Sequence, residues 1–167
     1  MIVRRANVAD VSDVARVVAA VAPEGFLGAQ PPVDVEERAD RLQALIEQGE
    51  PAAMWVLEDD DGETVGYLAV EESVPGVLSL GMAILPAQRG YGGGRALLDV
   101  ALEHAGNTGA HKISLEVWTD NARAIALYAG AGFEVEGLRR DHYRRQDGRL
   151  RSTLLMGRRV PAREHRG

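Results

Sequence analysis

The chain has 167 residues, of which 46% are hydrophobic and 26% charged, values typical of one globular domain with a proper core rather than two domains of ordinary size. The absence of cysteine excludes disulfides, thiolate metal sites and a cysteine nucleophile. No apolar run is long enough to span a bilayer, and the N-terminus lacks a signal-peptide core, so we expect a cytoplasmic protein with no membrane partner.

The formal net charge of −6 is unevenly distributed along the chain. Residues 1–75 carry 16 Asp and Glu against 5 Lys and Arg, whereas residues 76–167 carry 9 against 14. Because a cleft lined by one sign of charge concentrates the opposite sign, this division suits a cationic acceptor that meets an anionic cofactor. Chance segregation of surface charge explains it equally well. We expect no nucleic-acid partner.

Hydrophobic periodicity predicts one strand, two helices, three strands, a helix, a strand, a helix and a final pair of strands. Helices are expected to begin at Asn7, at Asp34, after a glycine-rich loop, and at Thr119 or Asp120. The strands are expected at residues 1–6, 53–58, 64–72, 77–85, 112–118, 133–145 and 150–159. This order predicts an α+β fold, a mixed and mostly antiparallel central sheet of about seven strands flanked by about four helices. We expect one domain over residues 1–160 and a flexible tail over 161–167.

A glycine-rich segment follows the third strand of the meander. The apolar run Leu80–Leu85 is stopped by Pro86, and residues 89–95 read RGYGGGR before a helical pattern begins. Glycines cost backbone entropy unless the chain needs positive φ or a close approach, and free N–H groups at a helix start favour an anion such as a pyrophosphate. The P-loop and dinucleotide patterns are both absent. A merely tight turn would also explain the glycines.

A second motif lies between residues 115 and 133, which read LEVWTDNARAIALYAGAGF. Asn121 and Tyr128 are seven residues apart, so both project from one face of a helix. Glu116 lies on the opposite strand face from its apolar neighbours Leu115 and Val117. A carboxylate in an interior strand needs a partner or a task, because burying an unpaired charge is costly.

Together the two motifs resemble those of the GCN5-related N-acetyltransferase (GNAT) family. The first is Arg89-x-x-Gly92-x-Gly94 with a proline three residues upstream, similar to the family's acyl-coenzyme A signature. The second matches the pattern N-x-x-A-x-x-L-Y-x-x-x-G-F at the family's separation. Within the family, the chain resembles the enzymes that acetylate the N-terminal alanine of ribosomal proteins and the amino-acid or phosphinothricin-type enzymes.

The resemblance implies direct transfer of the acetyl group of acetyl-CoA, the co-substrate, to a primary amine in a ternary complex. The acceptor is expected to be a peptide N-terminus or a small amine. Glu116 is expected to act as general base and Tyr128 as general acid, with no metal. The residues expected to bind the cofactor are Met82, Ala83, Ile84, Arg89, Gly90, Tyr91, Gly92, Gly93, Gly94, Arg95 and Asn121.

Several alternatives stay open at this stage. Glu116 could instead be a structural residue paired with an arginine of the C-terminal hairpin, which would leave Glu71, Glu72 or a water chain as the base. The chain could also be a non-catalytic acyl-coenzyme A sensor or a nucleotide-binding module. Phe26 in the 23–32 loop is expected to shape the acceptor pocket, which His142 and Tyr143 could reach, and a homodimer is possible.

Overall fold

The computed structural model describes residues 1–161. Its strands are β1 (Ile2–Arg5), β2 (Ala53–Glu58), β3 (Thr64–Val74), β4 (Val77–Ile84), β5 (Lys112–Trp118), β6 (Glu134–Arg144) and β7 (Leu150–Arg159). Its helices are α1 (Val11–Val21), α2 (Val35–Gln48), α3 (Gly93–Asn107) and α4 (Ala122–Gly130), with short 3-10 turns η1 (Val8–Asp10), η2 (Ala22–Glu24) and η3 (Pro86–Gln88). The predicted order of elements is confirmed. Apart from Pro161, the expected tail lies outside the described residues.

The seven strands form one sheet in the order β1-β2-β3-β4-β5-β7-β6. Every neighbouring pair is antiparallel except β4 and β5, which are parallel because α3 connects them. The α+β fold with a mixed, mostly antiparallel sheet is therefore confirmed. Within residues 1–161, no helix has the length and apolar composition needed to cross a membrane.

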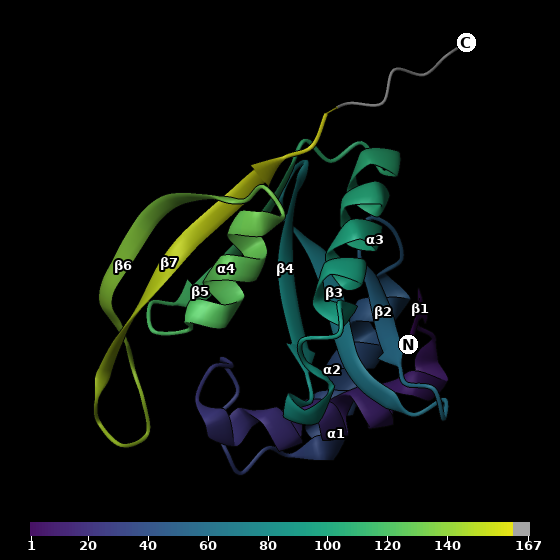
Figure 1. The fold of residues 1–167 in the computed structure, drawn as a ribbon, viewed down its shortest axis with the longest axis horizontal. Coiled ribbons are helices and arrows are strands. Elements are labelled where there is room, and N and C mark those ends of the chain that lie inside the picture. Colours follow the sequence, from purple (N-terminus) through teal and green to yellow (C-terminus); the bar gives the residue numbers. More distant parts are fainter. Residues whose placement is uncertain (162–167) are drawn as a thin grey trace.

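The sheet is split between β4 and β5. These strands pair over only three positions, Val77–Ser79 against Lys112–Ser114. β4 continues beside β3 to Ile84, and β5 stays paired with β7 over its whole length. Each strand therefore follows its other neighbour, and the two halves of the sheet spread apart beyond the short contact (Figure 1).

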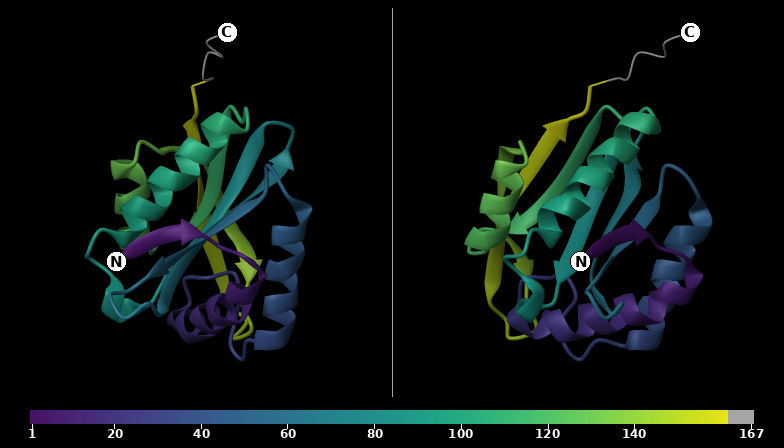
Figure 2. Two further views of the ribbon diagram at one scale, coloured as in Figure 1. Left: turned by 90° about the vertical axis from the view of Figure 1, so that its right-hand side faces the viewer. Right: turned by 45° about the vertical axis from the view of Figure 1, so that its right-hand side comes forward.

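Helices cover both faces of this sheet (Figure 2). α3 and α4 pack on one face, where Leu97 and Leu98 join Ile113 and Leu115 in the main core. α1 and α2 pack on the other face in a second cluster. Since side chains alternate along a strand, β5 directs Ile113, Leu115 and Val117 toward α3 and α4 and directs Glu116 to the opposite face.

Side chains that accept from free backbone N–H groups mark the helix starts. The predicted cap Asn7 forms a capping box with Asp10, and the predicted cap Asp34 accepts from the N–H of Glu37 at 3.0 Å. The last helix differs from expectation. It is capped by Asn121, which accepts from the N–H of Ala124 at 3.3 Å, and not by Thr119 or Asp120.

Two strand glycines make a matched test of packing. A Cβ on Gly66 would lie 2.9 Å from Ile84 Cγ1 and 3.0 Å from the Ala83 carbonyl oxygen, whereas one on Gly81 would meet nothing within 4 Å. We expect Gly66→Ala to lower the free energy of unfolding by about 1–3 kcal/mol through overpacking. Gly81→Ala should leave it unchanged or raise it by about 0.4–1 kcal/mol. Urea titration of both variants measures the difference, and equal stabilities would contradict this account of the β3–β4 contact.

Candidate active site

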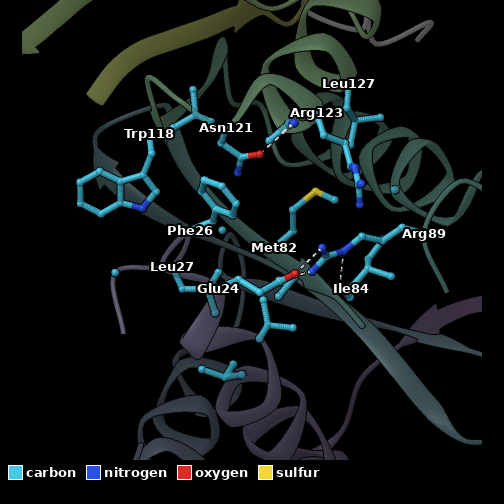
Figure 3. Close-up of a pocket in the computed structure, with 18 of the residues that line it drawn as sticks. Glu24, Phe26, Leu27, Met82, Ile84, Arg89, Trp118, Asn121, Arg123 and Leu127 are labelled. Atoms are coloured by element: carbon cyan, nitrogen blue, oxygen red, sulfur yellow. Dashed lines mark hydrogen bonds and ion pairs between the residues drawn. The ribbon is translucent and has the colours of Figure 1, made fainter. Parts of the chain in front are cut away.

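A cleft of about 1410 Å³ occupies the split between β4 and β5. On the α3 and α4 side it is lined by the glycine turn and by Tyr128. On the opposite face it is lined by Glu116, Trp118 and Tyr143, and by the loop that follows η2. Figure 3 shows Phe26, Leu27 and Trp118 at one end of this space and Arg89 and Ile84 at the other. The cleft therefore joins the two faces of the sheet.

The glycine turn places free donors at the start of α3. Gly90 and Gly92 both have φ of 87°, a left-handed conformation that side chains disfavour. The N–H groups of the first turn of a helix have no partner within the helix, and α3 has no side-chain cap. Gly93 is required by packing, since a Cβ there would lie 2.5 Å from Leu57 Cδ2. The turn thus presents N–H groups and the positive end of the α3 dipole to the cleft.

The two predicted arginines of this turn are held by the protein itself. Arg89 makes a two-pronged ion pair with Glu24 of η2, at 2.9 and 2.6 Å, and its Nε donates to the carbonyl of Ile84 at 2.8 Å. Arg89 holds the pKa of Glu24 below its ordinary value. Arg95 pairs with Asp99 on the surface of α3. Both arginines line the cleft, so they add positive charge there while fixing the turn.

Tyr91 is the one predicted cofactor residue that the structure places outside the cleft. Its side chain is 74% exposed and lies on a smaller surface pocket with Met1 and Val3. The other ten predicted cofactor residues, and both predicted catalytic residues, line the main cleft.

The main chain of β4 offers donors to the cleft in an alternating pattern. The N–H of Leu85 donates to the Val65 carbonyl at 2.9 Å, so odd-numbered residues of β4 direct their main-chain groups to β3. Met82 and Ile84 therefore direct theirs toward the split, and those of Ala83 point to β3. The Ile84 carbonyl already accepts from Arg89. The main-chain groups of Met82 and the N–H of Ile84 therefore form the open edge of β4.

Tyr128 lines the cleft from α4, as Tyr67 does from β3. α4 buries its ring, which contacts Phe133 edge-on with centroids 5.8 Å apart. Burial raises the pKa of the Tyr128 hydroxyl above its ordinary value, and nearby Tyr67 raises it further. The hydroxyl therefore stays protonated at neutral pH. Asn121 begins the same helix, and after its oxygen has capped α4 its amide nitrogen remains available to the cleft.

Glu116 is held by three donors. Arg139 of β6 pairs with its Oε1, and its Oε2 accepts from the Tyr143 hydroxyl at 2.6 Å and from Thr153 Oγ1 at 2.9 Å. The hydrogen bond to Glu116 raises the pKa of Tyr143. The carboxylate is thus paired with an arginine of the C-terminal hairpin and lines the cleft at the same time. Thr153, and which hairpin arginine pairs with Glu116, could not be predicted, because β7 pairs with β5, and β6 with β7, only in the tertiary structure.

The alternative bases lie elsewhere. Glu71 and Glu72 are exposed near the β3–β4 turn, outside the cleft lining, and Glu72 accepts from the N–H of Gly76 at 2.8 Å. His142 is exposed and contacts the ring of Tyr143, which does line the cleft. Of Glu71, Glu72 and Glu116, it is therefore Glu116 that faces the cleft.

Arginines surround Trp118 at the other end of the cleft. The guanidinium carbons of Arg151 and Arg145 lie 4.3 and 5.0 Å from the centre of a Trp118 ring, and Tyr143 meets the ring system edge-on at 5.3 Å. Arg151 pairs with Asp120 at 2.7 Å and donates to the Gly25 carbonyl. We call this end, built by Trp118, Tyr143, Arg145 and the 23–32 loop, the acceptor end. Its sequence signal was the arginine-rich hairpin, with arginines at 139, 140, 144, 145, 149 and 151.

The contact between Glu116 and Tyr143 makes a titration test. Replacing Glu116 with glutamine removes the negative charge that disfavours the Tyr143 phenolate and leaves Arg139, whose charge favours it. We therefore expect Glu116→Gln to lower the pKa of Tyr143, seen in the pH dependence of phenolate absorbance. Subtracting the titration of Tyr143→Phe identifies the signal, and Glu72→Gln is the control. If the Tyr143 titration stays in place, the contact is not formed in solution.

The comparisons with known proteins agree with this geometry. The model of the acetyltransferase (GNAT) family matches residues 22–133. An L-methionine sulfoximine/L-methionine sulfone acetyltransferase of Pseudomonas paraeruginosa is 30% identical over 141 residues, 81% of each chain. Some relatives are much longer: an uncharacterized protein, ML0378 of Mycobacterium leprae, is 55% identical over 62 residues, which is 37% of this chain but 16% of that protein.

Solved structures share the whole fold. The ribosomal-protein-alanine N-acetyltransferase of Brucella melitensis is 25% identical, with a TM-score of 0.84 over 96% of this chain and 100% of that one. A phosphinothricin acetyltransferase of Sinorhizobium meliloti, solved with acetyl-CoA, is 22% identical, with a TM-score of 0.82 over 98% and 94% of the two chains. The resemblance seen in the two motifs is confirmed: the chain belongs to the GNAT family of acetyltransferases.

Proposed function

We propose that this protein moves the acetyl group of acetyl-CoA directly to a primary amine while both substrates are bound. The observation that carries the proposal is the cleft through the sheet. Donors for an anion and the buried hydroxyl of Tyr128 lie on the α3 and α4 side, and a carboxylate lies on the opposite face. This arrangement lets two substrates enter from opposite faces and meet in the split.

The glycine turn and the open edge of β4 fit the coenzyme. Free N–H groups of Gly93, Gly94 and Arg95 suit its pyrophosphate, and there is open space above Gly90 and Gly92, where a Cβ would meet nothing within 4 Å. The main chain of Met82 and Ile84 suits the amide groups of its pantetheine arm, which would add to β4 like a strand. Acetyl-CoA supplies the thioester; the other groups needed for transfer belong to the chain.

Proton transfer is assigned to Glu116. An alkylamine is mostly protonated at neutral pH, with a reference pKa near ~10.4 for lysine, so it must lose a proton before it attacks. Glu116 accepts that proton, directly or through a water, while Arg139 and Thr153 hold the carboxylate in place. The amine nitrogen then bonds to the acetyl carbon as the carbon–sulfur bond breaks, and Tyr128 gives its proton to the departing sulfur. The second proton of the nitrogen returns to the Tyr128 oxygen, directly or through a water, and Glu116 releases the first proton to solvent.

The relatives support two classes of acceptor. One is named for methionine sulfoximine and methionine sulfone, which are small amino-acid derivatives, and a shared-fold structure is named for the N-terminal alanine of a ribosomal protein. Both present a primary amine. The proposal covers a small amine or a peptide N-terminus.

A turnover screen tests the proposal. The protein is incubated with acetyl-CoA and amino acids, polyamines, aminoglycosides or N-terminal peptides, and release of the coenzyme thiol is followed. We expect thiol release that depends on one amine class, and a melting temperature raised by acetyl-CoA more than by ATP or NAD. Stabilisation by acetyl-CoA without turnover of any amine would make the chain a sensor. Stabilisation by ATP or NAD alone would make it a nucleotide-binding module.

The Tyr128→Phe variant tests whether Tyr128 acts as the general acid or only binds the coenzyme. Loss of the hydroxyl removes the proton donor and keeps the buried ring, so kcat should fall by about 10²-fold while the KM for acetyl-CoA changes little. Steady-state kinetics against both substrates measures the two effects. The reverse pattern, a raised KM with kcat intact, would assign Tyr128 to binding.

Glu116→Gln tests the base. We expect kcat/KM to fall by about 10²- to 10⁴-fold and the acidic limb of its pH profile to disappear, because the amide cannot accept the proton. Glu72→Gln makes the same change outside the cleft and should preserve both rate and profile. A Glu116→Gln enzyme with an unchanged profile would move the base to a water chain.

A further inference from the structure

Arg145 sets the class of the acceptor. We infer that the acceptor is a small amino acid with a free carboxylate, and that Arg145 binds this carboxylate at the acceptor end. The inference rests on the proposed transfer to an amine and decides between the two acceptor classes. A peptide N-terminus has an amide where a free amino acid has its carboxylate.

The guanidinium of Arg145 makes no ion pair with a described carboxylate, although the charge of Asp147 acts on it from a longer distance. Its two described side-chain hydrogen bonds go to the carbonyls of Leu27, at 3.2 Å, and Gly28, at 3.4 Å, and its guanidinium lies against Trp118. Within residues 1–161, no carboxylate is within ion-pair distance of Arg145, and its guanidinium retains further N–H donors. Arg145 lines the cleft, so these donors are available to a ligand there.

The other arginines of this region differ in whether a carboxylate neutralises them: Arg144 lines the cleft with its described side-chain bond going to the Gly148 carbonyl, at 3.5 Å. Arg151 lies on the same tryptophan but is paired with Asp120, and Arg139 is paired with Glu116. Burial and the charge of Arg151 lower the pKa of Arg145, because its cation is partly desolvated beside another cation, and the charge of Asp147 offsets this only in part. An anionic group would relieve this repulsion, and a carboxylate matches the planar fork of a guanidinium.

The acceptor end is also closed by contacts between distant segments. Besides the bonds from Arg145 to the 23–32 loop, the N–H of Gln146 donates to the side chain of Gln30 at 2.9 Å, and Arg151 donates to the Gly25 carbonyl. The tip of the β6–β7 hairpin is thereby tied to the loop after η2. A peptide chain would have to break these bonds to pass between them, whereas a small amino acid would not.

Two aromatic side chains connect Arg145 to Glu116, the proposed base. Trp118 contacts both Arg145 and Tyr143, and Tyr143 donates to Glu116 at 2.6 Å. A ligand held by Arg145 therefore lies in the cleft that Glu116 also lines. The acidic first half of the sequence suggested a cationic acceptor, but the charged hairpin residues that line the cleft are the cations Arg144 and Arg145, and carboxylates such as Glu116 and Asp120 line it as well.

Matched acceptors test the inference. Each L-amino acid is compared with its carboxamide, which keeps the amine and the side chain and removes the anion, and with a tetrapeptide that begins with the same residue. We expect the best amino acid to exceed its amide and its peptide in kcat/KM by about 10- to 100-fold, the range of a charged hydrogen bond. The amide has the less basic amine, so this preference cannot come from easier deprotonation.

Arg145→Gln should remove the preference: kcat/KM for the amino acid should fall by about 10- to 100-fold, with little change for its amide and for the KM of acetyl-CoA. Arg140→Gln, the same change at an exposed β6 position outside the cleft lining, should change neither. Arg145→Lys, which keeps the charge but loses the fork, should fall between the two. Thermal melts show whether each variant is folded.

The outcomes distinguish a failure of the carboxylate inference from a failure of the proposed amine acetylation. Equal or better turnover of amides or peptides by the unchanged protein overturns the carboxylate inference and leaves amine acetylation standing. The same holds if a folded Arg145→Gln keeps its preference for amino acids. Failure of every amine class to release the thiol overturns the proposed function itself.

Discussion

The structure depends on the shortness of one parallel contact. β4 and β5 share three residue pairs and then follow β3 and β7, so a sheet that is otherwise continuous opens in its middle. An interior strand with an open edge exposes main-chain groups that must find partners. One of them, the Ile84 carbonyl, is satisfied by Arg89, and the remaining edge is left for a ligand. The opening is thus both a passage between the faces and a surface suited to an extended, amide-bearing molecule.

The same split divides the chemistry between two faces. The start of α3 brings backbone dipoles to one side, and the alternation of β5 brings a carboxylate to the other. α4 brings the side chain of Tyr128 to the same cleft. Burial keeps its hydroxyl protonated, which suits a donor to a leaving thiolate and not a base.

Ion pairs of the protein fix the walls of the cleft. Arg89 links the glycine turn to η2, and Arg139 links Glu116 to β6. Arg151 links Trp118 and Asp120 to the 23–32 loop. Each of these cations is neutralised where it stands. Arg145 differs, because its partners are carbonyl dipoles and an aromatic ring. A charge with partial compensation at a cleft wall is a natural place for a ligand of opposite sign.

Much of the fold was predictable because strands and helix caps depend on sequence patterns that involve a few neighbouring residues. Residues 112–118 were expected as a strand from alternation alone and form β5, and Asp34 was recognised as a cap because a side chain and an N–H three residues on are close in sequence. The cap of α4 was placed one or two residues early, because Thr119, Asp120 and Asn121 are all good caps and the turn geometry chooses among them. Tyr91 was grouped with its glycine neighbours, but the left-handed glycines turn it outward to solvent.

By itself, then, the sequence determined the order of elements, the glycine turn and the identity of the two motif side chains, since each depends on neighbours a few residues apart. Only the tertiary structure decided what those side chains face. Glu116 meets Arg139, Tyr143 and Thr153 through the register of β5, β6 and β7. Arg145, at the tip of the hairpin, meets Trp118 at the end of β5, and it meets the 23–32 loop across more than a hundred residues. Such contacts follow from strand pairing and side-chain packing in three dimensions, and no local pattern encodes them.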